Sequence, residues 1–274
     1  MTDKNEIYNE LQSIYAILPA DEYPETYDYI TDMLADEECM DEPLDMANAL
    51  AAYDKQTILP EYLIDFITEL LDGEIEKGNS DAMNDLGAMY YDGHRGFEQS
   101  FERAVYYYDM AAENGNRPAQ ENLGYCYYYG RIGAPDYKKA FHYFALGAFD
   151  GHLISLYKIG DMYLNGYYVK KNEKEAFFIY SRCIDTMTDE AMPFVAGPVF
   201  LRLGNMYLNG IGTGQNFMDA LACYQRAEFF LFSMVKDGNY MYKNSLFAAI
   251  AGQQKVREKL SAELPERDWT FDES

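Results

Sequence analysis

The chain has few of the side chains that most often act as nucleophiles, proton carriers or metal ligands. They are three histidines and four cysteines, at His94, His142, His152, Cys39, Cys126, Cys183 and Cys223. No CxxC pair occurs, and no serine or cysteine motif accompanies a histidine, so neither a zinc pattern nor an activated nucleophile is present. We therefore predict no catalytic residue, no metal site and no cofactor. We expect the cysteines to be small buried residues in a reducing compartment.

A glycine-rich stretch, GIGTG from Gly210 to Gly214, could be considered as a phosphate-binding loop. It lacks the Lys-Ser/Thr ending of a P-loop, and a helical pattern precedes it where a strand is required. We interpret it as a connection between two helices.

Acidic side chains dominate the composition. The chain has 46 Asp and Glu against 22 Lys and Arg, for a net charge of −24, and residues 1–80 hold 21 of the acids but only 3 of the bases. Nucleic acids and anionic membranes are bound through basic patches, so this balance argues against both as partners. We find no apolar run of membrane-spanning length and no secretory pattern at the start, and the expected location is the cytoplasm.

Four segments of the chain share one spacing of small and aromatic residues. Each contains a glycine after Leu or Ile, a tyrosine three residues later, a second glycine at six, an alanine at sixteen or seventeen, and a ring four residues beyond it. The first glycines are Gly87, Gly124, Gly160 and Gly204; the tyrosines are Tyr90, Tyr127, Tyr163 and Tyr207; the second glycines are Gly93, Gly130, Gly166 and Gly210; the rings are Tyr108, Phe144, Tyr180 and Tyr224.

This spacing predicts two helices per segment. Apolar residues three and four apart, such as Ala82, Leu86 and Met89, form one face of a first helix, helix A. Glycine inside a helix costs about 1 kcal/mol relative to alanine, so the first glycine indicates close approach of a second helix, helix B. The ring of helix B is expected to fill the gap between them. The second glycine fits a left-handed cap that ends helix A.

The residue order resembles the Sel-one-like repeat family, a branch of the tetratricopeptide-like superfamily. The pattern Ala-x4-Gly-x2-Tyr-x2-Gly, then a loop and Lys-Ala-x3-Phe, carries the resemblance from Ala119 to Ala148, and related segments cover about Ser80 to Gly238. The resemblance implies an all-α, right-handed α/α superhelix (solenoid) of helix pairs with helical caps at both ends. It also implies a non-enzymatic adaptor that holds other proteins.

We divide the chain into segments accordingly. They are an acidic helical N-terminal segment 1–42, a capping helix pair 43–79, repeats 80–116, 117–152, 153–197 and 198–238, a capping helix 239–262 and a tail 263–274. The third repeat carries about eight additional residues, and the fourth has a long second helix. The tail places Trp269 and Phe271 among acids, either as a frayed end or as a motif that docks on this chain or on a partner.

Several finer expectations concern the helices outside the repeats. We expect helices over Glu6–Leu18, Pro24–Glu38 (Tyr27, Ile30 and Leu34 inward), Pro43 to about Tyr53, and Pro60–Lys77 (Leu63, Phe66, Ile67, Leu70 and Leu71 inward). We also expect the apolar run Phe229 to Phe232 to be covered on more than one side, mainly by the last helix.

In tetratricopeptide-like superhelices helix A lines the concave face, so the resemblance implies that binding residues lie around the first glycine. Those selected are Asn84, Tyr91, Glu121, Tyr125, Tyr128, Tyr129, Lys158, Asp161, Arg202, Asn205 and Asn209. Tyrosine offers a large contact area with little side-chain entropy to lose. Lys158, Arg202 and the amides suggest a site for a peptide carboxylate.

The first functional hypothesis is therefore a non-enzymatic scaffold that binds a protein or peptide in the concave face of helices A. The alternative is an acidic decoy or inhibitor, in which the N-terminal segment occupies a basic site of a partner. A hydrolase on the same scaffold is a third hypothesis, without a catalytic constellation to support it.

Overall fold

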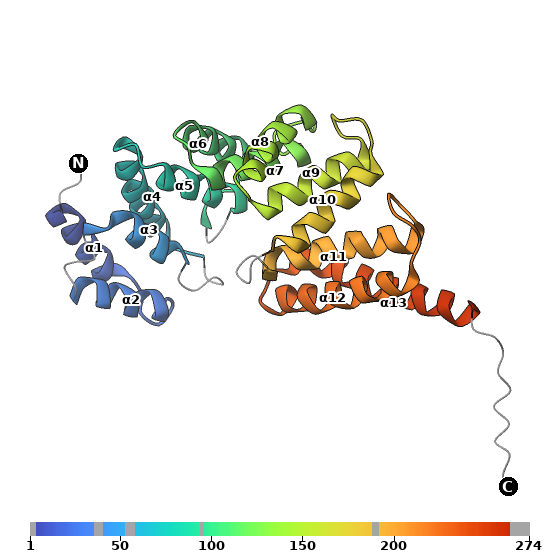
Figure 1. The fold of residues 1–274 in the computed structure, drawn as a ribbon. Coiled ribbons are helices and arrows are strands. Elements are labelled where there is room, and N and C mark those ends of the chain that lie inside the picture. Colours follow the sequence, from blue (N-terminus) through green and yellow to red (C-terminus); the bar gives the residue numbers. More distant parts are fainter. Residues whose placement is uncertain (1–3, 36–40, 53–57, 94–95, 188–191, 264–274) are drawn as a thin grey trace, which may run out of the picture. The chain divides into compact units, whose positions relative to one another are not determined.

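The computed structural model describes residues 4–35, 41–52, 58–93, 96–187 and 192–263, and every regular element in these residues is helical (Figure 1). The α-helices are α1 (Lys4–Ile17), α2 (Pro24–Ala35), α3 (Pro43–Ala52), α4 (Glu61–Glu76), α5 (Ser80–Asp92), α6 (Phe101–Glu113), α7 (Arg117–Tyr129), α8 (Tyr137–Phe149), α9 (Leu153–Asn165), α10 (Glu173–Asp185), α11 (Met192–Asn209), α12 (Phe217–Lys236) and α13 (Lys243–Glu263), with a 3-10 turn η3 (Tyr240–Tyr242). The all-α prediction is confirmed.

The chain divides into two units, residues 1–143 and residues 144–274. In the first unit α1 packs on α2, α3 on α4, α4 on α5, and α5 and α7 on α6. In the second, α9 packs on α10, α10 on α11, α11 on α12, and α12 on α13. Helix α8 begins in the first unit and ends in the second.

The four helices predicted before the first repeat are present, and the predicted ends at Glu38 and Tyr53 lie outside the described residues. All five residues predicted to face inward on α4 are buried. On α2 the prediction is only partly right, because Ile30 and Met33 are buried while Tyr27 and Leu34 are half-buried. The ring of Tyr27 stacks on Tyr15 of α1, with centroids 4.5 Å apart, and this contact leaves part of the ring exposed.

Contact between a helix-A glycine and a helix-B ring recurs along the repeats, as predicted. A Cβ atom added at Gly87 would lie 2.8 Å from the ring of Tyr108. The same atom would lie 2.7 Å from Tyr180 at Gly160 and 2.9 Å from Tyr224 at Gly204. Real Cβ atoms do not approach other atoms so closely, so glycine is required for this helix spacing. Gly124 in α7 is buried as well.

The loop between helices A and B has the same hydrogen bond in every repeat. Helix A ends at a left-handed glycine, with φ of 61° at Gly93, 63° at Gly130 and 75° at Gly166. The residue that precedes helix B then donates its backbone N–H to the carbonyl of the repeat tyrosine at 2.8–2.9 Å. The four pairs are Ser100 with Tyr90, Asp136 with Tyr127, Asn172 with Tyr163 and Asn216 with Tyr207.

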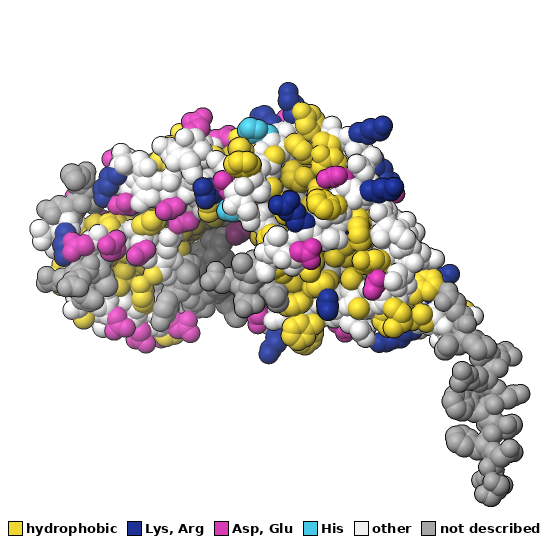
Figure 2. Space-filling model, viewed as in Figure 1, with side chains coloured by type: hydrophobic (Ala, Val, Ile, Leu, Met, Phe, Trp, Pro, Cys, Tyr) yellow, Lys and Arg dark blue, Asp and Glu magenta, His cyan; other side chains and the backbone are white. Residues whose placement is uncertain are grey.

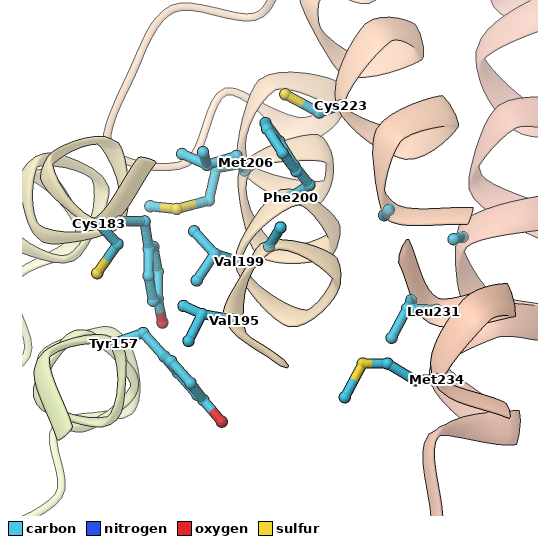
Figure 3. Close-up of a cluster of buried hydrophobic side chains, with 14 of the residues drawn as sticks. Tyr157, Cys183, Val195, Val199, Phe200, Met206, Cys223, Leu231 and Met234 are labelled. Atoms are coloured by element: carbon cyan, nitrogen blue, oxygen red, sulfur yellow. The ribbon is translucent and has the colours of Figure 1, made fainter. Parts of the chain in front are cut away.

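The core of the second unit contains buried residues of α9 to α13 (Figure 3). Helix α11 begins at Met192, so the repeat boundary predicted between residues 197 and 198 lies inside one continuous helix. The additional residues of the third repeat lengthen helix A of the fourth, where Val195 and Val199 are buried. Gly197 permits this packing, because a Cβ there would lie 2.8 Å from Leu231 on α12.

The apolar run on α12 is less covered than predicted. Helix α13 packs on α12 through Gly252, which faces the ring of Tyr224. Leu231 is fully buried, but Phe229 is 71% exposed and Phe232 is 60% exposed. Helices α11 and α13 cover two faces of α12, and these two rings project from another. No helix in the described residues is long and apolar enough to span a bilayer.

The glycine contact makes a direct prediction. Gly160→Leu should destabilise the chain by about 1–3 kcal/mol or more, because the buried Tyr180 ring leaves no room for a side chain. Gly214→Leu is the matched control, since a Cβ there meets nothing within 4 Å. Thermal unfolding followed by circular dichroism measures both. Equal melting temperatures for the two variants would contradict the assigned packing.

Candidate partner-binding surface

Four of the predicted binding tyrosines come together around an arginine that the prediction omitted. Tyr91 lies near the end of α5, while Tyr125, Tyr128 and Tyr129 lie near the end of α7. Arg131 follows the glycine that ends α7, and its Nε donates a hydrogen bond to the Tyr91 hydroxyl at 2.9 Å. We call these residues, together with Phe101 at the start of α6, the Arg131 cluster.

Aromatic rings surround the Arg131 guanidinium. Its carbon lies 5.4 Å from the ring centroid of Tyr91, 5.1 Å from that of Phe101 and 5.6 Å from that of Tyr129. A guanidinium within about 6 Å of a ring face gains about 0.5–1 kcal/mol at an exposed site. Because three rings and one hydroxyl hold this side chain, Arg131 is placed in one orientation although it is exposed.

The rings of α7 continue the cluster along the surface. Tyr125 stacks on Tyr129 with centroids 6.0 Å apart, and Tyr128 meets the edge of Tyr129 at 5.0 Å. Tyr128 also contacts Tyr137, the first residue of α8, at 5.8 Å. Tyr129 is 50% exposed, and the other two α7 rings are half-buried. The cluster thus offers rigid aromatic area to a partner.

The electrostatics of the cluster suit an anionic contact. Burial raises the pKa of Tyr91, and the Arg131 charge only partly opposes that effect, so the hydroxyl remains protonated at neutral pH. Within the part of the chain that the structure describes, no carboxylate forms an ion pair with Arg131. This is unusual in a chain of net charge −24. The terminal amino groups of Arg131 can therefore donate hydrogen bonds to an anion outside the chain.

Asn84, another predicted binding residue, belongs to a polar chain that links neighbouring helices of the first unit. Its amide donates to Asp85 at 3.2 Å, and its carbonyl accepts from Asn122 of α7 at 3.1 Å. Asp85 also accepts from Asn48 of α3 at 2.7 Å. These contacts hold α3, α5 and α7 in register. Glu121, next to Asn122, is half-buried.

The structure places three other predicted binding residues inside the packing of the second unit. Lys158 and Asp161 of α9 are 4% and 6% exposed. Arg202 of α11 donates through Nε and Nη2 to the two carboxylate oxygens of Asp161, the latter at 2.7 Å. The Tyr180 hydroxyl donates to the same carboxylate at 2.6 Å. The peptide-carboxylate site expected at Lys158 and Arg202 is therefore not supported, because Asp161 already occupies it.

The charges of this buried group stabilise one another. Burial alone would lower the pKa of Arg202, but the charge and hydrogen bonds of Asp161 outweigh burial and raise it. Burial, reinforced by the Asp161 charge, raises the pKa of Tyr180. Lys158 adds a second cation, with Nζ 3.8 Å from Asp161 Oδ2. Arg202 therefore stays charged and the Tyr180 hydroxyl stays protonated at neutral pH.

Asn205 and Asn209 remain at the surface of α11. The Asn205 side chain accepts a hydrogen bond from the Tyr224 hydroxyl at 2.8 Å. The Asn209 side chain donates to the backbone carbonyl of Asn205, also at 2.8 Å. Both side chains are exposed. Asn205 and Asn209 thus lie together, while the Arg202 side chain is held by Asp161.

The cysteines that the structure describes are buried, as predicted. Burial raises the pKa of Cys126 and Cys183 to about 12 and that of Cys223 to about 11, so these thiols are uncharged at neutral pH. Within the described residues no group of His, Cys, Asp and Glu could hold a metal ion. Cys39, His94 and Trp269 lie outside those residues.

The sequence prediction omitted Arg131, although the sequence gives an indication of it. Arg131 directly follows three tyrosines and the glycine that ends α7.

The buried ion pair yields a second prediction. Arg202→Met removes the main cation beside Asp161, and an uncompensated buried charge typically costs about 3–5 kcal/mol. Combining it with Asp161→Asn should recover a large part of that loss, because the stranded charge is removed as well. Urea unfolding of the two variants and the parent chain measures the difference. A single variant as stable as the parent would show that the pair is not buried as described.

Comparisons with known proteins agree with this architecture. The Sel1 repeat matches residues 80–116, 117–152, 153–182 and 201–228. The ERAD-associated E3 ubiquitin-protein ligase component HRD3B of Arabidopsis thaliana is 32% identical over 108 residues, which are 39% of this chain and 17% of that protein. The similarity thus spans less than a fifth of the relative.

Two solved structures share the fold over 95% of this chain. A Sel1 repeat protein from Oxalobacter formigenes has a TM-score of 0.61 at 21% identity, with 98% of its chain covered. A protective antigen of uropathogenic Escherichia coli strains with an SLR fold has a TM-score of 0.57 at 22% identity, with 54% covered. The two structures show the same solenoid fold, and the four matched repeats show that the chain belongs to the Sel1 repeat family.

Proposed function

We propose that this chain is an interaction scaffold that binds a protein or peptide partner through its helices A, with the Arg131 cluster as the main contact. Sel1 repeat proteins generally serve as scaffolds for protein interactions and are generally not enzymes. We assign this general role to the chain as well. The choice of surface is our own inference from the geometry.

The environment of Arg131 is the main support for this choice of surface. Arg131 is exposed, oriented by three rings and the Tyr91 hydroxyl, and without a carboxylate partner in the described part of the chain. Tyrosine and arginine are the residue types enriched at energetic centres of interfaces. A guanidinium held in place loses little entropy on binding, so a contact made there retains more of its free energy.

The geometry also favours a class of partner. Tyr125, Tyr128 and Tyr129 offer apolar faces and hydroxyl groups, which fit an extended peptide with a large apolar side chain. Arg131 adds two terminal amino groups that fit a carboxylate in bidentate form. We therefore propose a peptide or protein segment that presents an acidic group beside an apolar residue. The proposed contact does not include Lys158 and Arg202, because Asp161 holds Arg202.

The relative from Arabidopsis thaliana is a component of an E3 ubiquitin ligase. Similarity over 108 residues supports a comparable supporting role within an assembly, and we carry over nothing more. The alternative of an acidic decoy has no support in the comparisons. The acidic helices α1 and α2 pack through residues such as Ile7, Ile14 and Ile30, so much of this segment has a structural role.

A pair of substitutions tests the proposed surface. Tyr128→Ala combined with Arg131→Ala should weaken partner binding by about 2 kcal/mol or more, as expected for interface hot spots. Tyr106→Ala is the matched control, since this tyrosine is 61% exposed on α6 and lies outside the cluster. Pulldown from lysate of the source cells with mass spectrometry identifies the partner, and titration calorimetry gives the affinities.

Circular dichroism checks that each variant keeps its helices. If the double variant captures the same proteins with unchanged affinity, the Arg131 cluster is not the contact surface. If Tyr106→Ala weakens binding equally, the partner binds over helices B.

A further inference from the structure

The second unit has an apolar surface of its own. Residues of α11, α12 and the end of α10 line an open pocket of about 630 Å³. It is lined by Ile184, Met187, Phe200, Ala222, Gln225, Arg226, Phe229 and Phe230. We call it the Phe229 pocket. Figure 2 shows hydrophobic side chains gathered over the helices of the second unit on the face in view.

One exposed stripe of α12 forms much of the pocket wall. Ala222, Gln225, Arg226 and Phe229 follow the i, i+3, i+4, i+7 spacing of one helix face. Phe229 is 71% exposed, although it lies among other apolar side chains. Covering apolar surface that is otherwise exposed to water is favourable. An apolar ligand in this pocket would therefore be stabilised substantially.

The pocket also carries a positive charge. Arg226 lies with its guanidinium carbon 5.3 Å from the centroid of the Phe200 ring. Across the described ranges, no carboxylate forms an ion pair with it. The described lining of the pocket thus combines apolar walls with one cation. A matching ligand presents an aromatic or aliphatic side chain next to a carboxylate.

A segment of this same chain has that chemistry. Residues 264–274 lie outside the described part of the structure, and their sequence is LPERDWTFDES. Asp268 directly precedes Trp269, and Phe271 directly precedes Asp272. Each pair joins an aromatic ring to a carboxylate. We infer that this segment binds in the Phe229 pocket of its own chain, with Trp269 among the apolar side chains and a neighbouring carboxylate on Arg226.

The length of the segment is comparable with the distance along α12 from the end of α13 to the pocket. Helix α13 ends at Glu263, and its Leu260 packs with the cluster formed by Ala220, Tyr224 and Val256 near the start of α12. From Ala220 to Phe229 the helix rises about 14 Å, at 1.5 Å per residue. Six extended residues from Glu263 to Trp269 span about 20 Å.

A second copy of the chain is a poorer occupant. A symmetric contact centred on this pocket would bring Arg226 close to its own symmetry mate. Two chains of net charge −24 also repel each other over long distances. The segment 264–274 has four acidic side chains and one basic side chain, so its charge complements that of Arg226.

Tryptophan fluorescence of the full chain tests this inference, because Trp269 is the only tryptophan among the 274 residues. In the parent chain the emission should be blue-shifted relative to free N-acetyltryptophanamide, and acrylamide should quench it severalfold less. Phe229→Ser and Arg226→Glu should each move the emission toward that of the free compound and raise the quenching. Phe178→Ser is the matched control, since this ring is 58% exposed on α10 but does not line the pocket.

Far-UV circular dichroism confirms that the variants remain folded, which is expected because both substituted pocket residues are exposed. Emission from the parent chain like that of the free compound would overturn the inference. A blue shift that survives both pocket substitutions would place Trp269 elsewhere and also overturn it. Loss of the blue shift on dilution would show that another copy supplies the segment, which contradicts binding within one chain.

Discussion

Contact between a glycine of helix A and a ring of helix B determines the geometry of each repeat in which it is seen. Gly87, Gly160 and Gly204 each face a tyrosine ring at a distance that excludes any side chain. The helices are thereby held at a fixed separation, and the loop between them closes through one backbone hydrogen bond to the repeat tyrosine. The surface follows from this frame. Arg131 emerges at the glycine cap of α7, where its own N–H donates to the Cys126 carbonyl at 2.9 Å, and its side chain meets Tyr91.

The hydroxyl on the helix-B ring explains why the repeats differ in what they expose. Tyr180 and Tyr224 are buried, and a buried hydroxyl needs a hydrogen-bond acceptor. In both repeats the acceptor is the residue directly after the helix-A glycine, Asp161 or Asn205. In the second repeat the ring belongs to Phe144, and Tyr125 stands at the equivalent position with its ring half-buried and stacked on Tyr129. The residue after the helix-A glycine thus holds the helix-B ring in the last two repeats, while in the second repeat part of its own ring is exposed.

Much of the fold could be predicted because the repeat pattern encodes it locally. The helices, the glycine caps, the ring contacts and the buried face of α4 follow from spacing and residue size. The partner surface was less predictable, since it depends on pairs distant in sequence. Nothing near Lys158 shows that Asp161 meets Arg202, 41 positions away. The exposure of Phe229 and the extension of α11 to Met192 likewise depend on where neighbouring helices pack, which apolar periodicity does not specify.

In the function that we propose, the ends of helices α5 and α7 carry the partner contact. Hydrogen–deuterium exchange of the chain with and without its captured partner measures this directly. Slower exchange on binding is expected at Tyr91 and from Tyr125 to Arg131, with little change at the buried group of Asp161 and Arg202. Protection confined to helices B or to α1 and α2, with exchange unchanged around Arg131, would contradict it.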